Sequence, residues 1–296
     1  MDNMETFKTS EKLIKECIRD LYLDPRNLIL KWSKITNQTS QVRLAYPGQH
    51  LASVITGIKG TGTAARGDDL SDGSEVKSCS RADQLSECLD CGAKVLPWQR
   101  TCPICGSPNI NIKTDSHWIF SIKSEDELNF LLNEVPRIIL ILFDRESIES
   151  ETIRLRAWVI DPKHPYVKAF FEEYFYNNYM KKIEKGEKNP APCNLHPLKY
   201  DFYMMEPKLI FHAEINIEKR DVEIKFWNVE NPKLEPMPID LLRKKEIEDL
   251  FKEELSSGLT IDDIKRKYPF VPEDKRKNLR MRNKVIKKYK EKYRRR

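Results

Sequence analysis

The stretch from residue 66 to residue 80 combines acidic side chains, a turn and a lysine in an order that suits metal chemistry. The acidic pair Asp68-Asp69 precedes a turn at Asp72-Gly73, and the segment Glu75–Lys77 follows. Side chains alternate along an extended strand, so the glutamate and the lysine project from one face and the valine between them points into the core. A tight turn would place the acidic pair beside them.

Two carboxylates and an ammonium at one point suit a site that hydrolyses phosphodiesters with Mg²⁺. This ion prefers oxygen ligands and keeps several waters, so one or two carboxylates and a substrate phosphate suffice. It would polarise the phosphate and acidify a bound water, and a nearby lysine would orient that water. We therefore predict Asp69 and Glu75 as Mg²⁺ ligands and Lys77 as a catalytic residue, with Asp68 as the alternative to Asp69.

This pattern resembles the active site of the PD-(D/E)xK nucleases. The short acid-x-Lys motif alone says little, because 33% of the residues are charged and several other stretches contain it. Among these, only Glu223-Ile224-Lys225 is also expected in a strand. It lacks the acidic pair and the glycine turn ahead of it. We interpret it as the solvated face of a hairpin strand.

Four of the seven cysteines form two Cys-x₂-Cys pairs separated by ten residues. Such pairs turn tightly enough for four thiolates to surround one ion, which predicts a structural Zn²⁺ site. Two disulfides are the alternative, but no secretory segment is recognisable, and a reducing compartment disfavours disulfides. The predicted zinc ligands are Cys88, Cys91, Cys102 and Cys105.

The order of expected elements places these motifs in an α/β (α+β) fold. Hydrophobic periodicity predicts helices at about 11–22, 49–58 and 124–135, and strands at 75–78, 118–122, 138–143 and 154–159. Helix, three strands, helix, two strands is the order of the PD-(D/E)xK core. The cysteine segment, 86–108, would be a zinc knuckle inserted between two core strands.

The remaining chain is expected to add helices and one hairpin. We predict an aromatic-rich helix at 166–183, a polar linker at 185–197, a hairpin at 209–229 and three C-terminal helices that resemble a helix-turn-helix. The last helix would span 275–296, with thirteen Lys or Arg and one acid. The predicted domains are a nuclease core at 1–162, a helix and hairpin subdomain at 163–235 and a basic helical region at 236–296.

Residues 60–80, the cysteine quartet and Asp115–Trp118 together resemble the MamI-type restriction endonucleases, over about residues 49–120. The resemblance implies a type II enzyme that cleaves double-stranded DNA at a specific sequence and leaves 5′-phosphates. It also implies a homodimer whose two-fold axis matches a palindromic site. Six residues separate Asp68 from Glu75, the spacing of the mismatch-repair nuclease MutH; we nevertheless favour Asp69 as the ligand.

Composition agrees with an anionic partner. The net charge is +6 and the pI is about 8.8, which suits DNA without proving it. Arg81 is a candidate for contact with DNA phosphates, with surface solvation as the alternative. Arg154 and Arg156, on one strand face, are candidates for reading bases. No apolar run of 18 residues occurs, so we expect no membrane span and a cytoplasmic location. A non-catalytic zinc-containing DNA-binding regulator and a repair or structure-specific nuclease remain alternatives.

Overall fold

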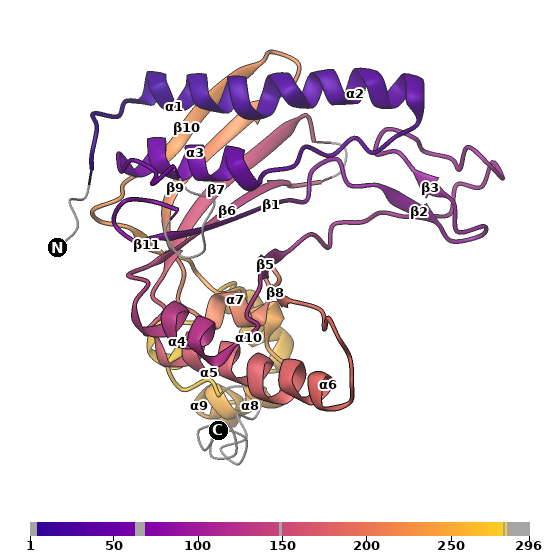
Figure 1. Cartoon of the computed structure of the whole chain (residues 1–296). Coiled ribbons are helices and arrows are strands. Elements are labelled where there is room, and N and C mark those ends of the chain that lie inside the picture. Colours follow the sequence, from indigo (N-terminus) through magenta and orange to yellow (C-terminus); the bar gives the residue numbers. More distant parts are fainter. Residues whose placement is uncertain (1–4, 63–68, 148–149, 281, 283–296) are drawn as a thin grey trace.

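A six-stranded mixed sheet forms the centre of the molecule (Figure 1). The computed structural model describes residues 5–62, 69–147, 150–280 and 282. The strand order is β1-β6-β7-β9-β10, with β11 paired to β9; β1 runs parallel to β6 and the other neighbours are antiparallel. The strands are β1 (Glu75–Ser80), β6 (Ile138–Arg145), β7 (Thr152–Ile160), β9 (Lys208–Asn216), β10 (Asp221–Trp227) and β11 (Lys233–Leu234). The mixed α/β class predicted from the sequence is confirmed, whereas the specific PD-(D/E)xK core stays a prediction.

Strand β6 has the sequence of a strand that is covered on both faces. Its first six residues, Ile138 to Phe143, are all apolar and fully buried, as expected of a central strand with packing on either side. Side chains alternate between two hydrophobic clusters: Leu140 belongs to one and Ile141 to the other. The sheet thus separates the hydrophobic core into two layers.

Helices α1 (Glu11–Ile18), α2 (Asp24–Thr36) and α3 (Ala45–Thr56) cover one face of the sheet (Figure 1). The helix predicted at 11–22 continues through a π-helical turn, Arg19–Leu23, into α2. Pro25 is the second residue of α2 and directly follows the π-helical turn, so the helical path runs on through this proline. Similarly, α3 starts four residues before the predicted Gln49, with Pro47 in its first turn.

Shorter helices pack on the other face and at its lower end in Figure 1. Ser124 caps α4 by accepting from the Glu127 N–H (3.2 Å), as the capping signal predicted. The aromatic helix expected at 166–183 forms α5 and α6, joined by the π-helical turn Phe175–Tyr179. The bounds are α4 (Glu125–Asn133), α5 (Pro165–Tyr174), α6 (Met180–Glu184), α7 (Tyr200–Met204), α8 (Lys244–Leu250), α9 (Lys252–Ser256), α10 (Ile261–Lys267) and α11 (Glu273–Arg276), with a 3₁₀ turn at Ile239–Leu241.

One predicted strand of the nuclease core lies outside the central sheet. Strand β5 (Trp118–Phe120) pairs antiparallel with β8 (Cys193–Leu195) in a separate two-stranded sheet. The linker predicted at 185–197 therefore contains a strand. Trp118 and Phe120 are buried and Ile119 is 52% exposed, so the side chains alternate as in a strand with one covered face. The segment is a strand as predicted, but it lies outside the core sheet in which the order of elements had placed it.

The cysteine segment forms a small sheet of its own between β1 and β5. Its strands, in the order β3-β2-β4, are β2 (Ser86–Cys88), β3 (Lys94–Val95) and β4 (Ile110–Asn111). A third hydrophobic cluster, which contains Cys88, Val95 and Cys102, forms its interior. So few buried apolar residues make a weak core, and a bound metal ion is the usual remedy in units of this size.

The C-terminal region differs from the prediction in its last helix. α10 begins with the expected capping box between Thr260 and Asp263, but α11 ends at Arg276 rather than extending from 275 toward 296. The Arg276 side chain is buried and donates to the carbonyls of Glu235 (2.8 Å) and Tyr203. This position is thus anchored to the core. The predicted segment at 283–296 lies outside the described residues.

None of the described helices has the length and apolar character needed to cross a membrane. The predicted domain boundaries stay predictions. The central sheet contains strands from both sides of residue 162.

We expect Ile141→Ala to lower the free energy of unfolding by about 2–5 kcal/mol, because the deletion leaves a cavity in a fully buried strand. Ile119→Ala serves as the control, since that side chain is half exposed; it should change stability by about 0.5 kcal/mol or less. Urea unfolding followed by circular dichroism measures both. Equal losses in the two variants would contradict the assignment of the core.

Candidate active site and metal centre

The turn at Asp72-Gly73 is fastened to the start of β6. Gly73 has a φ of +82°, a conformation that glycine adopts without steric cost. Asp72 accepts from the Ser74 N–H (3.0 Å) and pairs with Arg137 (2.8 Å), the residue before β6. Arg137 also donates to the Ser74 hydroxyl (2.9 Å). Asp72 is therefore occupied in holding the turn.

Asp69 lies beside the first residues of β1. Its Oδ2 atom accepts a hydrogen bond from the Val76 backbone N–H (2.7 Å), and the Gln49 side-chain amide donates to Oδ1. Asp69 is thus bound from both sides, by the strand and by helix α3. The alternative ligand, Asp68, lies outside the described residues.

Glu75 and Lys77 project from the same face of β1 and form an ion pair. Glu75 is only 8% exposed, and the Lys77 ammonium lies 5.7 Å from the centre of the Phe120 ring on β5. Val76, between them, belongs to the hydrophobic cluster on the opposite face. The structure therefore brings Asp69, Glu75 and Lys77 together at one end of the edge strand.

The electrostatics of Asp69 fit a site for a cation. Burial raises the pKa of Asp69, and the neighbouring negative charge of Glu75 raises it further. The Val76 hydrogen bond, the Lys77 ammonium and the Gln49 amide oppose this rise in pKa. Two adjacent carboxylates in a partly desolvated place repel each other, and a divalent cation between them would relieve that repulsion.

Gln49 is a contact that the sequence did not reveal. Helix α3 approaches β1 closely because Gly48 has no side chain: a Cβ at this position would lie 2.4 Å from the Ser78 hydroxyl oxygen. Ser78 in turn donates to the Leu44 carbonyl (2.6 Å). The only sequence signal was a glycine in the first turn of a helix, next to a glutamine. This close approach is what brings the Gln49 amide to Asp69.

The cysteine quartet is a compact cluster. The sulfur atoms of the four cysteines all lie within 4.8 Å of one another, with 3.6 Å between Cys88 and Cys105 and 3.5 Å between Cys91 and Cys102. A glycine at φ +73° follows each Cys-x₂-Cys pair and permits the tight turn. Such a donor set fits a tetrahedral Zn²⁺ ion and leaves no open position for a substrate. In the part of the chain that the structure describes, no other group of three or more metal-binding side chains is this compact.

The remaining candidate residues have other partners. Arg154 and Arg156 both bond to the buried Asp144 (3.1 and 2.7 Å), and Arg81 donates to two backbone carbonyls. Lys225 pairs with Glu223 (2.7 Å) and Glu214 (3.3 Å) on the exposed side of the β9–β10 hairpin. The alternative motif thus lies on a hairpin strand, as its sequence indicated.

Comparison with known proteins connects this site to a family. Residues 31–244 match the model of the MamI restriction endonuclease family. Because the match covers more than half of the chain and includes both the Asp69 cluster and the quartet, the chain belongs to that family. Among curated proteins, it is similar to the type II restriction enzyme MamI of Microbacterium ammoniaphilum, with 30% identity over 158 residues.

That alignment covers 53% of this chain and 46% of the relative, so the chain spans about half the length of the curated protein it matches. No solved structure matches the chain significantly. The comparisons therefore establish the family of this chain, and the reaction that it catalyses has to be inferred from the geometry of the site.

We expect Cys88→Ser to lose bound zinc and to lower the melting temperature, because the metal supports a unit with only a small hydrophobic core. Elemental analysis of the purified protein should find about one zinc ion per wild-type chain, as one tetrahedral site requires. Cys17→Ser, at a half-buried thiol outside the quartet, is the control and should retain zinc. Wild-type protein without zinc would contradict the assignment.

Proposed function

We propose that this chain is a type II restriction endonuclease that hydrolyses phosphodiester bonds at specific sites in double-stranded DNA with Mg²⁺. The observation that carries the proposal is the cluster of Asp69, Glu75 and Lys77 on one edge strand, inside the region that matches the family. The similarity to a type II restriction enzyme supports the same activity. Its biological role would be defence within a restriction-modification system.

Asp69 and Glu75 are the residues that would hold Mg²⁺. When bound, the ion would polarise the scissile phosphate and acidify a water molecule. Lys77 is placed to orient the attacking water and to stabilise the negative charge that develops on the phosphate. Its ion pair with Glu75 fixes the ammonium beside the carboxylates.

The remaining side chains of the site keep these groups in place. Val76 and Gln49 hold the Asp69 carboxylate by two hydrogen bonds, so its oxygens do not have to be ordered when the substrate binds. We further propose in-line attack with departure of the 3′-oxygen, which leaves 5′-phosphates. A homodimer that cleaves both strands of a palindromic site completes the proposal.

Lys77→Ala should bind DNA but lose cleavage by a factor on the order of 10²–10³, the loss typical of a group that stabilises charge in the transition state. Plasmid cleavage with Mg²⁺ and with EDTA measures this. Lys225→Ala is the matched control, because it removes the lysine of the alternative motif, and it should cleave normally. Discrete Mg²⁺-dependent fragments support the nuclease. A mobility shift without cleavage by the wild-type protein would instead indicate a non-catalytic DNA-binding protein.

Mg²⁺ should raise the melting temperature of the wild-type protein and have little effect on Asp69→Asn, since binding to the folded state alone stabilises it. The effect should shrink in acid. The pKa of Asp69 is raised, so a proton competes with the metal at a higher pH than it would for a free aspartate. Glu223→Gln is the control and should keep the wild-type response. An equal Mg²⁺ shift in Asp69→Asn would show that the ion binds elsewhere.

A further inference from the structure

A cavity of about 780 Å³ lies at the opposite end of β1 from Glu75. Helix α2 forms one side of it. Pro97, Trp98 and Arg100, which lie between the two cysteine pairs in the sequence, form another together with residues 112–114, which follow the second pair. The ends of β1 and β6 close the bottom. Seven Lys or Arg side chains line the cavity, against three acidic ones. Its walls therefore carry an excess of positive charge.

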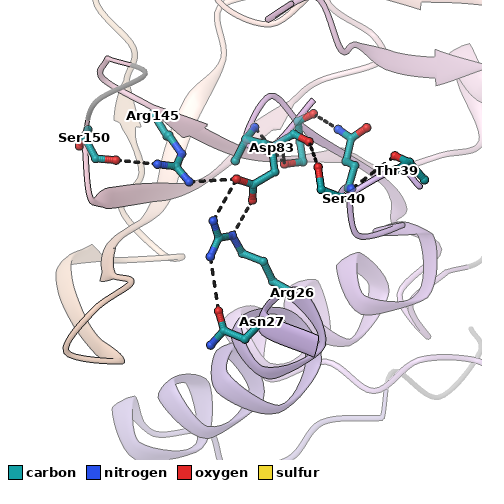
Figure 2. A network of polar contacts seen from close by, with 10 residues as sticks. Arg26, Asn27, Thr39, Ser40, Asp83, Arg145 and Ser150 are labelled. Atoms are coloured by element: carbon teal, nitrogen blue, oxygen red, sulfur yellow. Dashed lines mark hydrogen bonds and ion pairs between the residues drawn. The ribbon is translucent and has the colours of Figure 1, made fainter. Parts of the chain in front are cut away.

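The two buried acids of the cavity are each neutralised by two arginines. Asp83 accepts from Arg26 (2.5 and 2.9 Å) and from Arg145 (2.9 Å); Figure 2 shows both guanidinium groups directed at this carboxylate. Asp144 accepts in the same way from Arg154 and Arg156. These contacts hold the bottom of the cavity rigid without making it acidic.

The outer walls supply cations that have no carboxylate partner within the described ranges. Lys34 projects from α2, and its ammonium lies 5.7 Å from the centre of the Trp98 ring across the cavity. Arg100, two residues beyond that tryptophan, is exposed and forms no ion pair or hydrogen bond with the residues that the structure describes. Two elements far apart in the sequence thus present exposed positive charge to one space.

We propose that this cavity binds the sugar-phosphate backbone of double-stranded DNA several base pairs from the bond that is cut. The inference rests on the proposed function, because it locates a second contact of the same substrate. Phosphates are the anions that Lys and Arg neutralise in DNA complexes, and such contacts fix the register of the protein on the duplex. Lys34 and Arg100 are the principal contacts.

Strand β1 sets the spacing between the two contacts. Glu75 is its first residue and Arg81 follows its last, and a strand advances about 3.3 Å per residue, so the cavity lies roughly 20 Å from the acidic cluster. DNA rises about 3.4 Å per base pair, which makes this distance equivalent to about six base pairs. The cysteine quartet gains a role from this arrangement, because it folds the segment that carries Trp98 and Arg100.

The test is DNA binding by the full chain carrying Lys34→Gln and Arg100→Gln, measured by fluorescence anisotropy in Ca²⁺ at several salt concentrations. The probe is a duplex that contains the cleaved sequence or, if the chain does not cleave, a mixed-sequence duplex. We expect weaker binding and a slope of log affinity against log salt that is shallower by about two, because two phosphate contacts are lost. Lys12→Gln with Lys188→Gln removes the same charge from exposed positions outside the cavity and should leave the slope unchanged.

A neutral methylphosphonate placed at each position of the duplex in turn locates the contact. It should weaken wild-type binding at about six base pairs from the cut and should not weaken binding by the double variant further. An unchanged salt slope in a folded double variant would overturn the inference. Tight binding of a free mononucleotide by the wild-type protein, lost in the double variant, would also overturn it, because the cavity would then be a nucleotide site. Arg100→Gln alone provides the same test if the double variant does not fold. DNA binding in Ca²⁺ is measured without cleavage, so it tests the contact separately from the activity. If the wild-type chain does not cut DNA but the double variant still changes the salt slope, the proposed endonuclease activity is refuted and the proposed DNA contact is not.

Discussion

The parallel pairing of β1 with β6 is the constraint on which the rest of the site depends. It fixes the register of Glu75 opposite Ile138 and of Lys77 opposite Leu140, so the carboxylate and the ammonium leave the sheet on the same face. The turn ahead of β1 is fastened to the same neighbour through Asp72 and Arg137. Asp69 is then held against the strand by the Val76 N–H. A one-residue slip of this pairing would send Glu75 and Lys77 to the opposite face.

The edge position of β1 explains why this strand can carry both the proposed catalytic site and the proposed DNA contact. Within the part of the chain that the structure describes, β6 is its one hydrogen-bonded neighbour in the sheet, so the other edge does not have to pair with a strand. At its start, burial raises the pKa of Asp69, and the adjacent carboxylate of Glu75 raises it further by repulsion. At the end of β1, the arginines that line the cavity outnumber the carboxylates that they surround. A divalent cation would suit the first charge pattern and an anionic backbone the second.

Local signals in the sequence were sufficient for much of the fold. The apolar run of β6, the Ser124 cap of α4 and the clustering of the two cysteine pairs each depend on neighbouring residues, and each was predicted correctly; the zinc ion stays a prediction. Partners distant in the sequence were not. Alternation identified β5 but could not show that its partner is β8, more than seventy residues later. Similarly, the charged stretch after Lys275 suggested a long helix, whereas the buried Arg276 contacts two distant carbonyls at the end of a short one.

The candidate site shows the same division between local and distant information. The proximity of Asp69, Glu75 and Lys77 could be inferred from their spacing in the sequence, because a single turn connects them. The contribution of Gln49 was not, since it depends on how closely α3 packs against β1 at Gly48. The charged cavity was also hidden, because its cations come from α2 and from the cysteine segment.

The central claim is that Asp69 and Glu75 hold one divalent cation. The most direct test is anomalous X-ray diffraction from crystals of the protein soaked in Mn²⁺, an oxygen-preferring stand-in for Mg²⁺. We predict an Mn²⁺ peak, present above the manganese absorption edge and absent below it, between these two carboxylates and within coordination distance of both; the zinc of the cysteine quartet gives a separate peak that does not change across this edge. A peak located only at the Glu214 and Glu223 pair, or no peak near Asp69, would contradict the claim.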